Sequence, residues 1–121
     1  MIKRETYFKV FNILNTYWES NKIDELGRML SDMSPYTFVS DEYVSADPAV
    51  YEDWGSAWER TVMQKDSATP MQVFEVAKTI LDYYQHELGY DLGGSEDYLR
   101  DQLGLKKSKL GRTSSRERIT A

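Results

Sequence analysis

LGRMLSDMSPYTFVSDEYVSADPAVYEDWGSAW, residues 26–58, joins the end of one predicted helix to the start of another. The middle of this stretch lacks helical periodicity and is rich in aromatic and acidic side chains. Between residues 31 and 59 the chain has seven acidic residues and no Lys or Arg. We therefore expect helices on either side of an acidic, aromatic connector.

Helical periodicity is clear before the connector. Apolar residues recur every three or four positions over 6–20, with Thr6 in position to cap the N-terminus. The same spacing over 23–33 predicts a second helix that ends before Ser34-Pro35. These two helices are expected to pack as a helical hairpin.

After the connector, two predicted helices begin at residues that are typical of helix N-caps. Asp47-Pro48 combines an N-cap residue with proline at the first helical position, and it predicts a helix over 48–65. Thr69-Pro70, with Gln72 three residues after the threonine, is a capping-box pattern that predicts a helix over 70–88. Both starts predict that the chain after the connector is helical.

A glycine marks the end of the helix over 70–88, and a serine marks the start of the last predicted helix. Gly89 supplies a C-cap for the helix over 70–88, whose apolar stripe includes Leu88. Ser95 is the expected N-cap of a short helix over 96–103. The fold class is therefore all-α, a single-domain bundle of about five helices, in which the connector is either a loop or a small hairpin.

Length and composition limit the function classes. A chain of 121 residues with 40% hydrophobic residues fits one folded domain. It has no Cys, which excludes a disulfide scaffold and thiolate metal sites. Residues 1–15 lack the uninterrupted apolar core of a signal peptide, and no run approaches the roughly 18 apolar residues of a membrane span. We expect a cytoplasmic protein without a membrane partner.

Acidic and basic residues are distributed unevenly along the chain. Residues 1–104 hold nine Lys and Arg against nineteen Asp and Glu, whereas residues 105–121 hold six basic residues and one Glu. We predict an acidic helical domain followed by a basic, disordered tail. The acidic domain favours a basic protein partner over duplex DNA, unless its charge serves only solubility. Any nucleic-acid contact would involve residues 106–118.

Catalytic and metal-binding patterns are missing from the sequence. His86, the single histidine, lies off the apolar stripe of its helix and is expected to face solvent. The GYDLGG stretch, residues 89–94, lacks the lysine of a phosphate-binding loop and reads as a turn. We therefore predict no catalytic residues, no cofactor, no metal and no enzymatic activity.

Tyrosine and phenylalanine beside acidic residues are typical of protein interfaces, where aromatic rings supply rigid contact area. Alternatively, the connector aromatics fold back over the core as a lid. Glu52, Ser56 and Glu59 fall at i, i+4 and i+7 on one face of the helix over 48–65, and Glu52 and Glu59 are expected to project into solvent or onto a partner. The predicted partner-binding residues are Asp32, Tyr36, Phe38, Asp41, Glu42, Tyr43, Glu52, Asp53 and Glu59. The same surface would also suit a homodimer.

Two short motifs flank the connector: LSDM at residues 30–33 and ADPAVYEDW at residues 46–54. Together they resemble a group of small, acidic, helical bacterial proteins that look like immunity proteins of contact-dependent or polymorphic toxin systems. The resemblance spans about Tyr7 to Trp58, more loosely to Leu88, and excludes the basic tail. It implies a protein that binds and neutralises a cognate toxin domain, and it assigns no binding residue.

The leading functional hypothesis is a non-enzymatic immunity protein that masks a basic toxin domain, such as a nuclease, by direct binding. The alternative is a nucleic-acid-associated or regulatory adaptor that uses the basic tail. Deletion of residues 105–121 separates the two hypotheses, because only the adaptor would then lose its ligand.

Overall fold

Five α-helices and one π-helical turn make up the part of the chain that the structure describes. The computed structural model describes residues 3–36, 44–62 and 68–105. The elements are α1 (Lys3–Asn21), α2 (Asp24–Met33), α3 (Pro48–Thr61), α4 (Pro70–Asp82), η1 (Tyr83–Glu87) and α5 (Ser95–Gln102). The predicted all-α class is confirmed. The hairpin predicted within the connector falls at residues 40–42, outside the described residues, as does the tail from residue 106.

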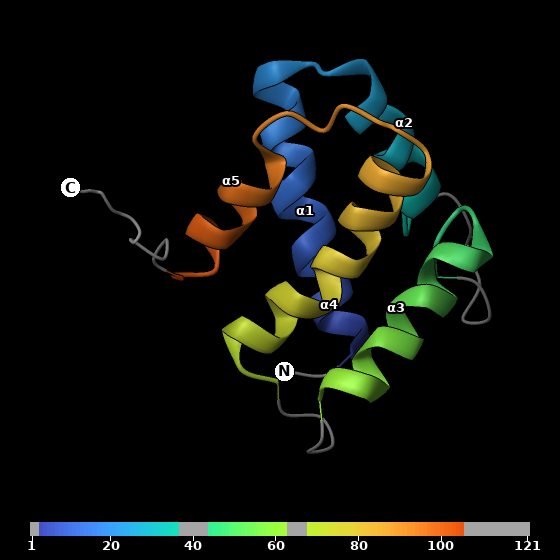
Figure 1. Cartoon of the computed structure of the whole chain (residues 1–121), viewed down its shortest axis with the longest axis vertical. Coiled ribbons are helices and arrows are strands. Elements are labelled where there is room, and N and C mark those ends of the chain that lie inside the picture. The colour runs from blue at the N-terminus through green and yellow to red at the C-terminus, as the bar shows by residue number, and fades with distance from the viewer. Residues whose placement is uncertain (1–2, 37–43, 63–67, 106–121) are drawn as a thin grey trace.

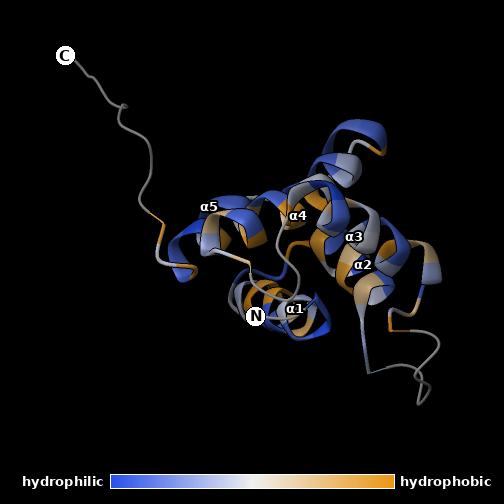
Figure 2. Cartoon of the chain, turned by 90° about the horizontal axis from the view of Figure 1, so that it is seen from below, coloured by the Kyte–Doolittle hydropathy of each residue, from blue (hydrophilic) through white to orange (hydrophobic). Residues whose placement is uncertain are grey.

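The helices surround one apolar core (Figure 1). Helix α1 packs against α2, α3 and α5, while α4 lies between α3 and α5. Hydrophobic residues lie on the sides of the helices that face one another, and hydrophilic residues lie on the outer sides (Figure 2). The largest fully buried side chains include Trp54, Tyr7, Leu14, Leu26 and Leu81. No helix in the described ranges has the length and apolar character needed to cross a bilayer.

Helices α1 and α2 form the predicted hairpin. The turn places Lys22 at φ +51°, and its backbone N–H donates to the Trp18 carbonyl at 2.6 Å. The Lys22 ammonium lies 4.0 Å from the centroid of the Trp18 ring. The expected N-cap role of Thr6 is wrong, because α1 already begins at Lys3. Thr6 is buried inside the helix, where its hydroxyl donates to the Lys3 carbonyl at 2.9 Å.

Both capping signals after the connector are confirmed. The Asp47 carboxylate accepts from the Ala49 N–H at 3.1 Å at the start of α3. Thr69 and Gln72 form the reciprocal capping box of α4, with bonds of 2.9 and 3.2 Å. Helix α3 ends at Thr61, four residues before the predicted 65.

Helix α4 does not end as a regular α-helix. Its last turn widens into η1, closed by a bond from the Leu88 N–H to the Tyr83 carbonyl at 3.2 Å. Gly89 follows with φ +70°, which confirms the predicted left-handed residue after the helix. Leu88 is 46% exposed, so its prediction as a core residue is wrong. One extra residue in a helical turn rotates the following side chains by about 100°.

The segment before α5 is the predicted turn. Gly93 has φ +60°, and a Cβ there would lie 2.3 Å from Ile23 Cδ1. The Gly94 N–H donates to the Tyr17 hydroxyl at 2.9 Å, which fixes the turn onto α1. The expected N-cap role of Ser95 is wrong: Gly94 occupies the N-cap position and α5 begins at Ser95.

Candidate functional site

The end of α2 and the start of α3 are joined directly by backbone hydrogen bonds. The Ala46 N–H donates to the Ser34 carbonyl at 3.0 Å, and the Asp47 N–H donates to the Asp32 carbonyl at 2.9 Å. These bonds close the base of the connector. They bring Asp32 of α2 next to Asp47, the N-cap of α3.

Asp32 takes part in a contact between distant segments. Its carboxylate accepts a hydrogen bond from the Tyr84 hydroxyl at 2.9 Å, across 52 residues of chain. Burial raises the pKa of the Tyr84 hydroxyl, and the hydrogen bond to Asp32 and the charges of Asp32 and Asp47 raise it further. Asp32, predicted as a partner contact, therefore links α2 to the end of α4.

Tyr36 is the connector aromatic that the structure describes. Its ring lies at 5.9 Å from the centroids of both Phe8 and Phe11, and its hydroxyl is 3.3 Å from Asn12 Oδ1. The side chain covers part of α1, as the lid interpretation expects, yet the residue is 62% exposed. The other predicted connector residues lie outside the described residues: Phe38, Asp41, Glu42 and Tyr43.

The outer face of α3 carries the remaining predicted residues. Glu52, Asp53 and Glu59 are exposed, whereas Trp54 and Trp58 on the opposite face are buried. Within the described ranges, no Lys or Arg side chain forms an ion pair with any of these three acids. Helix α3 therefore presents exposed carboxylates that form no ion pair, and its other face is packed into the core.

A small cleft between α3 and the end of α4 adds residues that the sequence reasoning missed. The cleft has a volume of about 150 Å³. Its lining residues are Asp47, Ala49, Val50, Asp53, Ile80, Tyr83 and Tyr84. Tyr83 is 47% exposed at this position. No local pattern could have revealed the cleft, because its two walls are about thirty residues apart in the chain.

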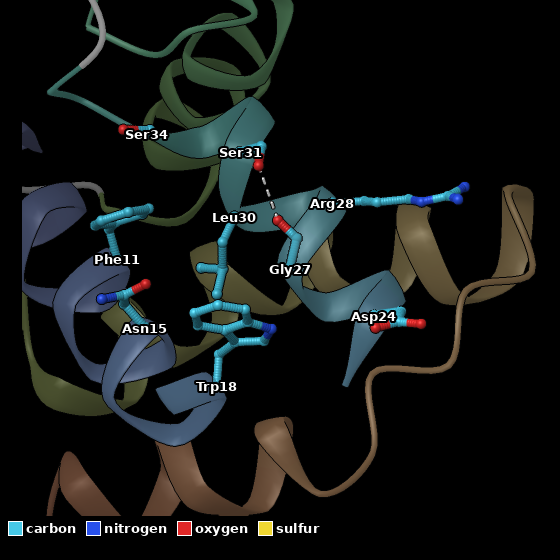
Figure 3. Close-up of a pocket in the computed structure, with 9 residues that line it drawn as sticks. All are labelled: Phe11, Asn15, Trp18, Asp24, Gly27, Arg28, Leu30, Ser31 and Ser34. Carbon is cyan, nitrogen blue, oxygen red and sulfur yellow. Dashed lines mark hydrogen bonds between the residues drawn. The ribbon is translucent and has the colours of Figure 1, made fainter. Parts of the chain in front are cut away.

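A larger groove of about 450 Å³ runs between α1 and α2 (Figure 3). Phe11, Asn15 and Trp18 line it from α1, and Gly27 and Leu30 lie opposite on α2. A Cβ at Gly27 would lie 2.8 Å from Trp18 Nε1, so glycine makes room for the indole. The two charged residues at the groove, Asp24 and Arg28, are of opposite sign, and the groove therefore favours neither acidic nor basic ligands.

Metal ions in proteins are commonly held by clusters of His, Cys, Asp and Glu side chains. The described part of the chain contains no cluster of three or more such residues. The His86 side chain is 73% exposed, as predicted, and its Nε2 lies 3.9 Å from Asp82 Oδ1.

Comparisons of the chain with protein-family models, curated proteins and solved structures find no match.

Proposed function

We propose that this chain is a non-enzymatic binding protein that neutralises a basic partner by covering it, as an immunity protein does with a toxin domain. The observation that carries the proposal is the face of α3, where Glu52, Asp53 and Glu59 are exposed and form no ion pair within the described residues. Uncompensated carboxylates lose little by pairing with a partner's cations, because no internal ion pair has to break first.

The proposed mechanism needs no bond making or breaking. Carboxylates on a helix held by buried Trp54 and Trp58 steer a basic surface into contact and speed association at low salt. Exposed Tyr36 and Tyr83 then supply apolar contact area, which slows dissociation. The bound protein would block the partner's own substrate path.

The test begins with capture of the partner. The full chain, carrying an affinity tag, is incubated with a nuclease-treated lysate of its own source cells and eluted with increasing salt. We expect a basic polypeptide in equal amount, identified by mass spectrometry. Purified, this polypeptide is used to measure the dissociation constant and its salt dependence for each variant.

A charge-reversal pair decides whether α3 is the contact surface. Glu52→Lys with Glu59→Lys should leave the helical circular dichroism unchanged and weaken binding at least tenfold, with a smaller salt dependence. The matched control is Glu19→Lys with Asp101→Lys, which makes the same charge change at exposed positions of α1 and α5. Equal binding by both double variants would exclude the α3 face, and failure to capture a basic polypeptide would contradict the proposed function.

A further inference from the structure

The cleft between α3 and the end of α4 combines an apolar interior with a negative rim. Buried Val50 and Ile80 form its apolar part, and exposed Asp47 and Asp53 stand at its edge. Among the described residues that line it there is no Lys or Arg. At about 150 Å³ it suits the end of one side chain rather than a helix or a strand.

Of the two carboxylates that line the cleft, that of Asp53 has fewer favourable contacts within the protein. Asp47 already accepts the Ala49 N–H and lies at the N-terminus of α3, where the helix dipole favours its charge. The Asp53 carboxylate has no hydrogen bond or ion pair within the described residues. A third carboxylate, that of Asp32, stands behind the cleft on the Tyr84 hydroxyl. The local charge is therefore strongly negative.

Aromatic rings complete the cleft. Tyr83 and Tyr84 are adjacent in sequence, yet Tyr83 is 47% exposed whereas Tyr84 is 5% exposed. Their ring centroids are 5.6 Å apart with an interplanar angle of 88°, so the two rings meet edge to face. Both line the cleft beside Asp53. The cleft thus offers aromatic and carboxylate groups to the same ligand.

We propose that this cleft binds one arginine side chain of a partner protein, with the guanidinium between the Asp53 carboxylate and the Tyr83 ring. The inference deepens the proposed function and rests on it for the source of the arginine. A planar guanidinium stacks on aromatic rings and pairs with a carboxylate through two parallel hydrogen bonds. A lysine ammonium is a strongly hydrated point charge and uses such a site less well.

The test uses a defined probe and needs no captured partner. N-acetyl-arginine amide is titrated into the ¹⁵N-labelled full chain at low salt and neutral pH, and amide resonances are followed by two-dimensional NMR. N-acetyl-citrulline amide, of nearly the same shape but neutral, and N-acetyl-lysine amide serve as comparisons. We expect saturable shifts at residues 47–53 and 80–84 with arginine, weaker ones with lysine and none with citrulline.

Variants of the cleft should change the affinity for the arginine probe. Asp53→Asn should weaken it about two- to fivefold, the range measured for exposed ion pairs. Tyr83→Leu keeps an apolar side chain but removes the ring, and should weaken binding by a similar factor. The control Asp101→Asn removes one exposed carboxylate on α5 and should leave the affinity unchanged.

Several results would overturn the arginine assignment. These are equal shifts with arginine and citrulline, equal affinity for arginine and lysine, or an Asp53→Asn variant that binds like the Asp101→Asn control. Such failure leaves the proposed function intact if the Glu52→Lys, Glu59→Lys variant still loses the captured partner. Conversely, an arginine-binding cleft in a chain that captures no basic protein would refute the proposed function alone.

Discussion

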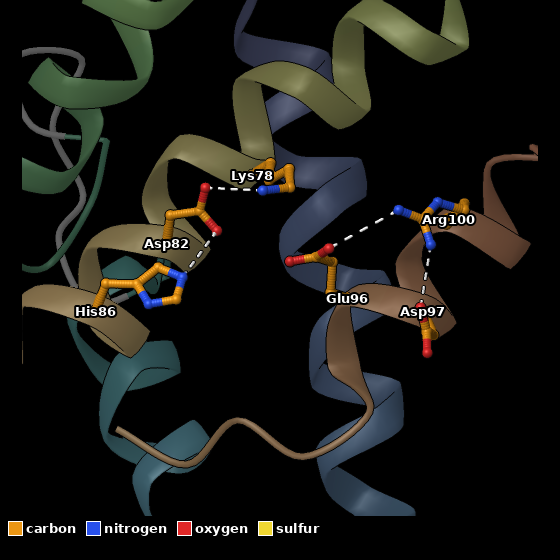
Figure 4. Close-up of polar contacts among 6 residues, drawn as sticks. All are labelled: Lys78, Asp82, His86, Glu96, Asp97 and Arg100. Atoms are coloured by element: carbon orange, nitrogen blue, oxygen red, sulfur yellow. Dashed lines mark hydrogen bonds and ion pairs between the residues drawn. The ribbon is translucent and has the colours of Figure 1, made fainter. Parts of the chain in front are cut away.

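Acidic residues on two sides of this protein have different surroundings. On α4 and α5 three acids have basic neighbours (Figure 4): Lys78 Nζ lies 2.9 Å from Asp82, and Arg100 lies 3.1 Å from Asp97 and 3.8 Å from Glu96. On α3 no comparable pair exists among the described residues. The first arrangement neutralises part of its own charge within the protein, and the second leaves its carboxylates free to pair with a partner.

The difference follows from residue spacing. Side chains three or four positions apart meet on a helix, and Lys78 with Asp82 or Glu96 with Arg100 have this spacing. The positions four residues after Glu52 and Asp53 are Ser56 and Ala57, which carry no charge. The negative face of α3 is therefore a property of the sequence, and its support by the core is a property of the fold.

The largest expected effect is the loss of stability on removing the side chain of Trp54, which packs α3 onto the core. Trp54 is fully buried and its Nε1 donates to the Lys3 carbonyl at 3.2 Å, which holds α3 against the start of α1. Trp54→Ala should lower the free energy of unfolding by about 3–5 kcal/mol through the cavity it leaves. Urea denaturation followed by circular dichroism measures the loss. The neighbouring exposed control, Asp53→Ala, should stay within about 0.5 kcal/mol of the parent.

A pH titration probes the link between Asp32 and Tyr84. The pKa of Tyr84 is raised in the folded state, and that of Tyr7 is raised by burial, whereas an unfolded tyrosine titrates near pH 10. Above that pH the unfolded chain releases protons that the folded chain keeps, so stability falls as the pH rises. Below it these tyrosines contribute no pH dependence.

Tyr84→Phe isolates the contribution of the Tyr84 hydroxyl to the loss of stability at alkaline pH. The free energy of unfolding, measured by urea denaturation from pH 8 to 11, should decline less steeply above pH 10 in the variant than in the parent. At neutral pH the variant should be less stable by about 1–2 kcal/mol, because Asp32 loses its hydrogen-bond donor. Parallel curves for the two proteins above pH 10 would contradict the raised pKa.

The smallest expected effect is a gain in stability from adding a basic residue to α3, where it could form ion pairs like those of α4 and α5. Ser56 is exposed, four residues after Glu52 and three before Glu59. Ser56→Lys should raise the free energy of unfolding by about 0.3–0.5 kcal/mol relative to Ser56→Ala, which separates charge pairing from helix propensity. The increment should shrink at high salt. An equal stability of the two variants at low salt would show that spacing alone does not create the pair.

Local signals in the sequence predicted most of the fold. Apolar periodicity located each α-helix of the described residues, and the caps at Asp47 and Thr69 gave the starts of α3 and α4, because these contacts span only two or three residues. The N-cap predictions that rested on one residue type alone, without a proline or a capping box beside it, were wrong. Thr6 and Ser95 have the chemistry of N-caps, but tertiary packing buries both side chains inside the fold.

What the sequence determined by itself is the helical character of the chain and the negative outer face of α3, since both depend on spacing along one helix. The tertiary structure alone decided that Asp32 meets Tyr84, that a π-turn begins at Tyr83 and leaves Leu88 exposed, and that α3 and the end of the α4–η1 helix enclose a cleft with Asp53 at its edge. These features join segments about thirty to fifty residues apart. Such pairings are set by the packing of the whole core, which no local pattern encodes.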